Sequence, residues 1–392
     1  MFLNAFSSSS WTAPATASLF TGQYPVRHGV TRGFHAAKER VREVEREGHS
    51  VLTLNRMPRT TATLPERLRS RGYATFGLAT NPNIGHEIGF DRGFDRFERL
   101  KTNSAELVFD RLLEWESTIK ERTPYFIYVH LNDTHPPYVP RQPWYRPTGN
   151  PRDDVRAAYD SEIRYVDGVL EKLVGRFDPD DNGVLVVLSD HGEEFWEHGA
   201  LGHFFSLHAE VNRILFLVRA PTLGVSPRVV SANVSIVDVL PTLLELVAGE
   251  PTKAGAGGGL DEALEGRSLI ELLTARDRAS ASGRELAQRP LFAHREHRLT
   301  PDRQLWAVIR GRWKLIEEGQ SQQLFDLKAD PAERWIFNKH HPHVVAGLSQ
   351  ELERFRMRAA AEQREFGGLS VDRERLEELR ILGYVEDGDR AE

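Results

Sequence analysis

Short apolar runs alternate with longer amphipathic stretches along the N-terminal part of this chain of 392 residues. The runs at residues 125–131, 184–188 and 214–218 are too short and too uniformly apolar for an amphipathic helix, which predicts buried parallel strands. Residues 104–122 and 154–177 repeat apolar positions every three or four residues against a charged background, which predicts helices. This alternation indicates an α/β fold with a mostly parallel central sheet flanked by helices.

The pattern changes beyond residue 238. A helix is expected to begin near Asp238, because Pro241 suits a first helical turn, and to stop at Gly249. The run 254–259 is nearly all Ala and Gly, which predicts an exposed linker followed by a domain seam. Beyond it we expect a small C-terminal α+β subdomain, with two antiparallel strands and a helix lying on them, at residues 306–316, 322–327 and 344–366.

Composition excludes several classes of function. The net charge of -6 is modest and the two signs are interleaved, so nucleic acid is not an expected partner. The absence of cysteine excludes disulfides, thiolate nucleophiles and thiolate metal sites. No apolar run reaches the roughly 18 residues of a membrane span, and residues 1–10 lack the features of a signal peptide. We therefore expect a soluble chain without a membrane span, cytoplasmic by default.

The first candidate for chemistry is a hydroxyl at the start of a predicted helix. Thr12 stands where a helix N-cap belongs, Pro14 is tolerated in the first turn, and Gly22 is a suitable stop. A helix N-terminus offers unpaired N–H groups and a partial positive charge, which suit a tetrahedral anion and an alkoxide nucleophile. A plain capping threonine is the alternative interpretation.

A carboxylate and an imidazole follow directly after the apolar run 184–188. Asp190 and His191 lie just beyond the carboxyl end of this predicted strand, which is the edge where open α/β sheets bind ligands. Both side chains can reach one divalent ion if Gly192 lets the backbone turn sharply. A solvated loop with a capping aspartate is the alternative.

Two further clusters contain histidines. One includes His198 and His203 beside several glutamates, and the other includes His135, where two prolines fix the direction of the loop. Each cluster by itself is also compatible with a hydrogen-bonded structural role.

Together these segments resemble the sulfatase family, a branch of the alkaline-phosphatase superfamily. The family signature places a nucleophile, a proline two residues later and Thr-Gly nine and ten residues later, and Thr12, Pro14, Thr21 and Gly22 match that spacing. The segment from Asp190 to Gly192 resembles the family's metal motif. Further matches follow in order along nearly the whole chain, at residues 72–75, 93–95, 202–203, 214–217, 238–242, 311–316, 324–327 and 330–333.

The resemblance implies an alkaline-phosphatase-like hydrolase of sulfate or phosphate esters that uses one or two divalent metal ions, Ca, Mn, Mg or Zn. It implies that Thr12 is the nucleophile and a metal ligand, and that Asp190 and His191 are metal ligands. His135 and His203 would contact substrate, protecting the leaving oxygen or holding the equatorial oxygens. The substrate would be a small-molecule, glycan or lipid ester. The implied domains are a catalytic domain, a linker with a short helix, and a C-terminal subdomain, over residues 1–253, 254–286 and 287–392.

The chain departs from the family pattern in two ways. Thr12 and Thr16 stand where sulfatases have the Cys or Ser precursor of formylglycine and an Arg, and a threonine cannot yield that aldehyde, so no formylglycine is expected. Threonine nucleophiles occur in relatives that act on phosphate esters or transfer phospho-head groups, which favours phosphorus over sulfur. Family members also open with an apolar strand that ends in metal-binding acids, and we expect this strand to be absent from residues 1–253. A head-group phosphotransferase and a metal-free binding protein are the alternatives.

Overall fold

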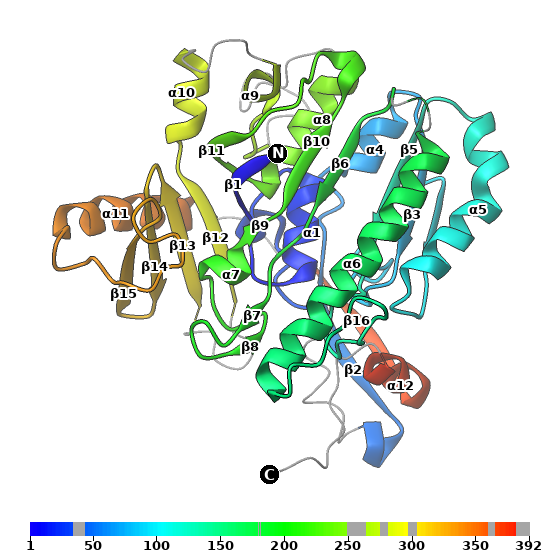
Figure 1. The fold of residues 1–392 in the computed structure, drawn as a ribbon, viewed down its shortest axis with the longest axis horizontal. Coiled ribbons are helices and arrows are strands. Elements are labelled where there is room, and N and C mark those ends of the chain that lie inside the picture. Colours follow the sequence, from blue (N-terminus) through cyan, green and yellow to red (C-terminus); the bar gives the residue numbers. More distant parts are fainter. Residues whose placement is uncertain are drawn as a thin grey trace. The chain divides into compact units, whose positions relative to one another are not determined.

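The computed structural model describes residues 1–33, 44–178, 180, 182–248, 264–274, 281–296, 304–359 and 365–381. The chain forms two compact units, each built from several segments (Figure 1). Unit 1 contains residues Met1–Thr31, Met57–Leu64 and Asn182–Glu365, and unit 2 contains Arg32–Arg56, Pro65–Asp181 and Phe366–Glu392. The boundaries that we expected at residues 253 and 286 stay a prediction.

Unit 1 holds most of the strands. Its elements are β1 (Phe2–Phe6), α1 (Thr12–Thr21), α2 (Pro25–His28), β6 (Leu185–Leu188), β7 (Glu194–Phe195), β8 (Leu201–Gly202), α7 (Ala209–Asn212), β9 (Arg213–Ile214), β10 (Phe216–Arg219), η2 (Pro221–Leu223), β11 (Val230–Ser235), η3 (Ile236–Asp238), α8 (Val239–Ala248), α9 (Ile270–Thr274), α10 (Ala281–Gln288), β12 (Leu291–Arg295), β13 (Leu305–Arg310), β14 (Trp313–Glu318), β15 (Ser321–Asp326) and α11 (Pro342–Ala359).

The strands of unit 1 that lead to the predicted site run in both directions. β1 pairs in parallel with β11 and antiparallel with β9, and β6 pairs antiparallel with β10. The expectation of a parallel strand over 214–218 was therefore wrong, and the run is divided between β9 and β10 at Leu215. Apolar sequence indicates that a strand is buried but does not encode its direction, which only the pairing partner decides.

Helix α1 differs from the prediction by one residue at its start. Trp11 is the N-cap in an extended conformation, and Thr12 is the first helical residue rather than the cap. The predicted stop is confirmed, because Gly22 has a φ of 66° and its N–H reaches the Ser18 carbonyl at 2.8 Å. All ten residues of α1 are buried, which its small side chains permit because they let neighbouring elements approach closely.

The helix expected near Asp238 is confirmed as η3 followed by α8. Ser235 caps it, since its backbone N–H donates to Asp238 Oδ2 at 2.8 Å in a capping box. The stop predicted at Gly249 and the linker predicted over 254–259 lie outside the described residues.

The C-terminal sheet has four strands, in the order β12-β13-β14-β15, and all neighbours are antiparallel. The stretch 306–316 was predicted as one strand, but it contains parts of β13 and β14, because Gly311, with a φ of 59°, allows a tight turn between them. Helix α11 packs on this sheet, where Leu348, Leu352 and Phe355 join the core (Figure 1). The predicted helix over 344–366 was too long, since α11 ends at Ala359 and β16 begins at Glu365.

Unit 2 is a parallel sheet covered by helices. Its elements are β2 (His49–Arg56), α4 (Leu64–Arg69), β3 (Ala74–Ala79), β4 (Arg96–Arg99), α5 (Ala105–Glu121), β5 (Tyr125–His130), α6 (Pro151–Phe177), β16 (Glu365–Asp372) and α12 (Arg373–Ile381), although α4 and β16 each begin with one residue of unit 1. Strands β4, β3 and β5 are mutually parallel, and α5 and α6 share a core with β3 around the buried Trp115. This arrangement confirms the helices predicted at 104–122 and 154–177. Among the described residues, none of the helices has the length and apolar character needed to cross a bilayer.

Two leucines on α5 give a direct test of this core. Leu112 is fully buried, whereas Leu107 is 51% exposed on the same helix. We expect Leu112→Ala to lower the free energy of unfolding by about 2–5 kcal/mol, because it leaves a cavity in the core. Leu107→Ala should change it by no more than about 0.5 kcal/mol. Urea denaturation followed by circular dichroism measures both, and equal losses would contradict the assigned helix faces.

Candidate functional site

The end of β6 and the start of α1 bring the three predicted metal ligands together within unit 1. His191 Nε2 lies 3.3 Å from Thr12 Oγ1 and 3.7 Å from Asp190 Oδ2. The backbone N–H of His191 donates to Asp190 Oδ1 at 3.0 Å, which holds the carboxylate against the strand end. Thr12 is 3% exposed, so the surrounding protein shields its side chain from bulk water.

The hydrogen bonds of His191 fix its tautomer. Its Nδ1 lies 2.8 Å from the Gly192 carbonyl oxygen, and a carbonyl can only accept a hydrogen bond. Nδ1 must therefore carry the hydrogen, and in the neutral ring Nε2 presents a lone pair toward Thr12 Oγ1. A lone pair in this position can accept the proton of the threonine hydroxyl or bind a cation.

Gly192 is required by packing rather than by an unusual φ angle. A Cβ at this position would lie 2.1 Å from the carbonyl oxygen of Glu210, which is backbone and cannot move aside cheaply. The Gly192 N–H donates to the Val211 carbonyl at 2.7 Å, so the turn after β6 is fastened to α7. The sequence predicts a sharp turn at this glycine, and the close approach of the Glu210 carbonyl is the reason that the position requires glycine.

His203 lies beside the same site. Its ring centroid is 4.4 Å from that of His191, and its Nδ1 is 3.0 Å from Glu193 Oε1. Burial, and then the neighbouring His191, hold the pKa of His203 well below its usual value, so the ring is neutral near pH 7. With Glu193 accepting from Nδ1, the Nε2 atom of His203 is an acceptor. Glu193 is one of the several glutamates near His203 in the sequence, and its pairing with His203 depends on the β7–β8 hairpin.

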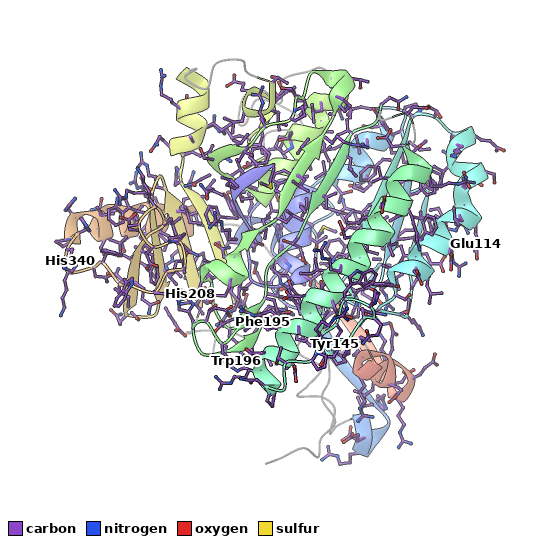
Figure 2. All side chains as sticks on the ribbon, viewed as in Figure 1. Glu114, Tyr145, Phe195, Trp196, His208 and His340 are labelled. Carbon is purple, nitrogen blue, oxygen red and sulfur yellow. The ribbon has the colours of Figure 1, made fainter. Side chains whose placement is uncertain are left out.

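His198 belongs to a separate structural cluster. Its ring stacks on His208 with centroids 3.8 Å apart, its Nδ1 lies 2.6 Å from Glu210, and its Nε2 lies 2.9 Å from the Glu333 carbonyl oxygen (His208 is labelled in Figure 2). Lys314 pairs with Glu333 at 2.8 Å, and both side chains are fully buried. These contacts give His198 the hydrogen-bonded structural role that the sequence left open.

His135 belongs to unit 2, in the loop after β5. Its Nδ1 lies 2.7 Å from the Pro136 carbonyl oxygen, and the Pro136–Pro137 peptide bond is cis. The contacts described for His135 do not test its expected role toward substrate, which stays a prediction.

Unit 2 also contains a set of hydrogen-bonded asparagines that the sequence motifs did not indicate. Asn81 donates to Asn132 Oδ1 at 2.7 Å, and Asn132 donates to Asn103 Oδ1 at 3.0 Å. Asn81 and Asn132 each lie two residues beyond the end of a parallel strand, β3 and β5, whose last residues are register partners. That equivalence could have been found by aligning the two predicted strand ends, because carboxyl ends of parallel strands meet at one edge.

The donor atoms around His191 Nε2 can be compared with the size of a cation. Cis donors on an octahedral calcium ion, with bonds of roughly 2.3–2.6 Å, would be about 3.3–3.7 Å apart, and those on magnesium only about 3 Å apart. Donors on a tetrahedral zinc ion, with bonds of about 2.0–2.1 Å, would also be about 3.3–3.4 Å apart. The observed 3.3 and 3.7 Å therefore leave room for a divalent ion without selecting one of the four. Within the described part of the chain, no group of three or more His, Asp or Glu side chains could hold a metal, so Thr12 would be the third protein donor here.

Two buried carboxyl groups near His135 share one arginine. Arg141 Nη2 lies 3.5 Å from Asp133 Oδ1 and 3.4 Å from Glu162 Oε1. Burial raises the pKa of Glu162 to about 8, with Asp133 adding to the rise and Arg141 opposing it. Burial likewise raises the pKa of Asp133 to about 6. At neutral pH Glu162 is therefore mostly protonated.

Known proteins resemble this chain in sequence. The sequence profile of one family, described as Sulfatase, matches residues 1–249. An N-acetylgalactosamine-6-O-sulfatase of Bacteroides thetaiotaomicron is 25% identical over 74% of this chain and 57% of its own length. An Arylsulfatase K of Xenopus laevis is 23% identical over 90% of this chain and 75% of its own length. The chain thus spans little more than half of the first relative.

Solved structures share the fold. The phosphonate monoester hydrolase of Agrobacterium radiobacter has a TM-score of 0.69 at 17% identity, covering 91% of this chain and 88% of its own. A protein solved with its substrate D-glucosamine-2-N,6-O-disulfate also has a TM-score of 0.69, at 15% identity, covering 92% and 91%. These likenesses confirm the predicted α/β fold of alkaline-phosphatase type.

The pKa of Glu162 predicts a pH dependence of stability. An acid whose pKa is near 4.5 when unfolded and about 8 when folded binds more protons in the folded state, so stability falls as pH rises between these values. Glu162→Gln removes this titration. Its free energy of unfolding relative to the parent should therefore increase from pH 5 to pH 8, as measured by urea denaturation at several pH values. A difference that stays constant or declines with pH would contradict the raised pKa.

Proposed function

The chain belongs to the sulfatase family, and from this premise we propose that it hydrolyses sulfate or phosphate esters with Thr12 as the nucleophile. The observation that carries the proposal is the 3.3 Å contact between Thr12 Oγ1 and His191 Nε2 at the start of a buried helix. A hydroxyl nucleophile needs a base within hydrogen-bond reach whose orientation is fixed by a third group. Here the Gly192 carbonyl supplies that orientation.

The start of α1 suits the anion that would be attacked. Thr12 is the first helical residue, and Trp11 provides no side-chain cap, so the N–H groups of the first turn are not satisfied by a capping side chain. Such N–H groups, with the positive end of the helix dipole, favour a tetrahedral sulfate or phosphate group beside Thr12. The same groups would stabilise charge that develops on its oxygens during attack.

With no cation on Nε2, His191 would take the proton of Thr12 at Nε2 as Thr12 Oγ1 attacks the sulfur or phosphorus atom. The Oγ1–S or Oγ1–P bond forms while the bond to the ester oxygen breaks, and the ester oxygen leaves as an alcohol by taking the proton that His191 received from Thr12. Water then cleaves the threonine ester, which releases sulfate or phosphate and restores the hydroxyl. Asp190, at 3.7 Å from Nε2, stabilises the positive charge on the His191 ring.

We propose a divalent cation at the same place, held by Asp190, His191 and Thr12. A bound ion would occupy the Nε2 lone pair of His191, so it would replace His191 as the group that activates the Thr12 hydroxyl, by lowering the pKa of that oxygen ligand. It would also neutralise the negative charge of the substrate. His203 and His135 are proposed to contact the substrate. A neutral His203, with Nδ1 donating to Glu193, would accept a hydrogen bond from substrate or water through Nε2.

The proposal favours phosphorus, because Thr12 cannot form the aldehyde that sulfatases make from Cys or Ser. The related proteins named above include both a sulfatase and a phosphonate monoester hydrolase, so both chemistries occur on this fold. An aryl sulfate, an aryl phosphate monoester and an aryl phosphodiester therefore form the minimal substrate set.

Removal of the hydroxyl tests the nucleophile. Thr12→Ala should lower kcat on the best of the three substrates at least about a thousandfold, because no covalent ester can form. Thr12→Ser keeps a hydroxyl and should retain measurable turnover. Mass spectrometry of quenched parent enzyme should detect the ester on the peptide that contains Thr12.

The matched control is Thr222→Ala, which changes an exposed threonine of the same unit and should leave kcat unchanged. Equal rates for the parent and Thr12→Ala would remove Thr12 from the mechanism. No turnover by the parent, with calcium supplied, would favour the metal-free binding protein.

Metal binding has its own test, independent of turnover. Asp190→Asn should weaken calcium binding by at least about tenfold in isothermal titration calorimetry, because it removes a charged oxygen donor. It should also abolish the rise in melting temperature that calcium gives the parent. Glu197→Gln alters an exposed acid of the same loop and should behave like the parent. Equal calcium affinity in Asp190→Asn and in the parent would contradict the proposed site.

A further inference from the structure

The connection between β15 and α11 in unit 1, residues 327–341, carries two exposed apolar side chains that the proposed reaction does not use (Figure 1). Trp335 is 69% exposed and Ile336 is 53% exposed. Folding usually covers tryptophan and isoleucine, and adjacent exposed apolar residues are a candidate interaction site, whereas scattered single ones are ordinary. The neighbouring residues show how this pair is held and which partner it fits.

The chain before the pair is fixed by buried polar contacts. Glu333 has a φ of 55°, in the left-handed region that residues other than glycine seldom adopt. Its side chain pairs with Lys314 at 2.8 Å, where both side chains are fully buried, and its carbonyl oxygen lies 2.9 Å from His198 Nε2. Trp335 N–H donates to Asp330 Oδ2 at 2.7 Å. The backbone is therefore held on its approach to the pair, and the indole is presented to solvent.

The chain after the pair is fastened to β15. Phe337 N–H donates to the Leu324 carbonyl oxygen at 2.8 Å, and Leu324 N–H donates to Asn338 Oδ1 at 2.7 Å. The Asn338 side chain also donates to the Gln322 carbonyl oxygen at 2.8 Å. Because the backbone is anchored on both sides of the pair, the exposure of the two side chains is a property of the fold.

Charge in the connection is divided by burial. Both of its acids, Asp330 and Glu333, are buried. Its three bases, Lys328, Arg334 and Lys339, are exposed, and none of them forms an ion pair with another described residue. Although the whole chain has a net charge of -6, this connection presents two apolar side chains among positive charges. A partner of negative charge is complementary to it.

From this arrangement we propose that the connection docks unit 1 on the surface of an anionic lipid bilayer. Trp335 and Ile336 would enter the boundary between the head groups and the acyl chains, where indole rings are favoured. The three bases would lie against the negative head groups, with their aliphatic stems along the apolar boundary.

A lipid surface fits the connection better than a protein partner does. Stable protein interfaces bury about 800 Å² on each partner around a well-packed core, which two large exposed apolar side chains do not provide by themselves. A fluid bilayer needs no matching shape, so a short apolar tip flanked by bases is sufficient for docking.

The test is co-sedimentation of the full chain with vesicles of phosphatidylcholine, alone or mixed with phosphatidylglycerol. The parent should bind the mixed vesicles at least about tenfold more tightly than the neutral ones, and high salt should remove this difference. Trp335→Ala and the double variant Arg334→Gln/Lys339→Gln should each weaken binding to the mixed vesicles at least about tenfold. Brominated phosphatidylcholine should quench tryptophan fluorescence in the parent more strongly than in Trp335→Ala.

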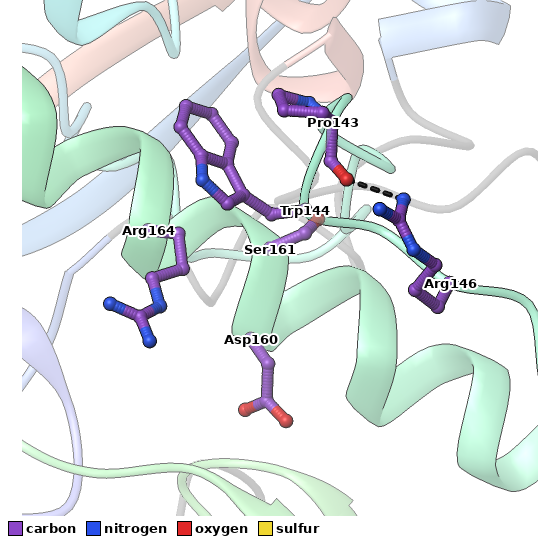
Figure 3. A pocket seen from close by; sticks show the side chains of 6 residues that line it. All are labelled: Pro143, Trp144, Arg146, Asp160, Ser161 and Arg164. Carbon is purple, nitrogen blue, oxygen red and sulfur yellow. Dashed lines mark hydrogen bonds between the residues drawn. The ribbon is translucent and has the colours of Figure 1, made fainter.

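The matched controls change similar side chains in unit 2. Trp144 is 46% exposed but shares a pocket with the carboxylate of Asp160 (Figure 3), and Arg176 pairs with Glu116 at 2.6 Å. Trp144→Ala and Arg176→Gln should bind the mixed vesicles as the parent does. Thr12→Ala should also bind them as the parent does, so lipid binding and the proposed reaction can fail separately.

The proposal is overturned if the parent does not bind the mixed vesicles, or if Trp335→Ala and the double variant bind them as the parent does. Two other outcomes also overturn it. Binding of dextran sulfate that depends on Trp335, without binding to vesicles, would assign the connection to a soluble polyanion. A dimer in solution that Trp335→Ala dissociates would assign it to a second copy of the chain. Circular dichroism of each variant checks that the fold is retained.

Discussion

The segment between β1 and α1 is fastened on two sides, and the geometry of the candidate site depends on this. On one side Ser7 N–H donates to the Asn212 carbonyl at 2.8 Å, the Asn212 side chain returns a bond to the Ser7 carbonyl at 2.7 Å, and Phe204 N–H reaches the Ser10 carbonyl at 3.0 Å. On the other side His294 N–H donates to the Ser8 carbonyl at 2.9 Å. Because backbone groups without partners are costly when buried, these bonds hold the start of α1 in one place.

The opposite half of the site is fixed by close packing. The turn after β6 passes so near the Glu210 carbonyl that Gly192 has no room for a Cβ atom, and the same turn orients His191 through the Gly192 carbonyl. One segment therefore positions the hydroxyl and another positions the imidazole, and the segment of residues 204–212 contacts both. A substitution that displaces the segment of residues 204–212 should therefore alter the 3.3 Å contact between Thr12 and His191.

The histidines of unit 1 show how similar residues acquire different roles. His203 is buried against Glu193 beside His191, whereas His198 is stacked on His208 and held by the side chain of Glu210 and the carbonyl oxygen of Glu333. The first lies beside His191 in the candidate site, and the second ties the β7–β8 hairpin to Glu333, which follows the C-terminal sheet. Their sequence contexts, each next to a glycine and near several glutamates, are nearly alike.

The sequence alone determined the local features of this protein. Apolar runs and helical periodicity identified β5, β6, α5, α6 and α8. Both signals depend only on the order of apolar and polar residues within a short segment. The spacing of Thr12, Pro14 and Gly22 located α1 to within one residue, and the strand end after β6 singled out Asp190 and His191.

Only the tertiary structure decided the antiparallel direction of β10, the hairpin within 306–316, the Glu193–His203 pair and the tautomer of His191. Each of these features depends on a hydrogen bond or a packing contact that the periodic pattern of apolar residues does not encode. Several of these contacts join segments that are far apart in the chain. No local pattern specifies which partner a strand, a ring nitrogen or a glycine will meet.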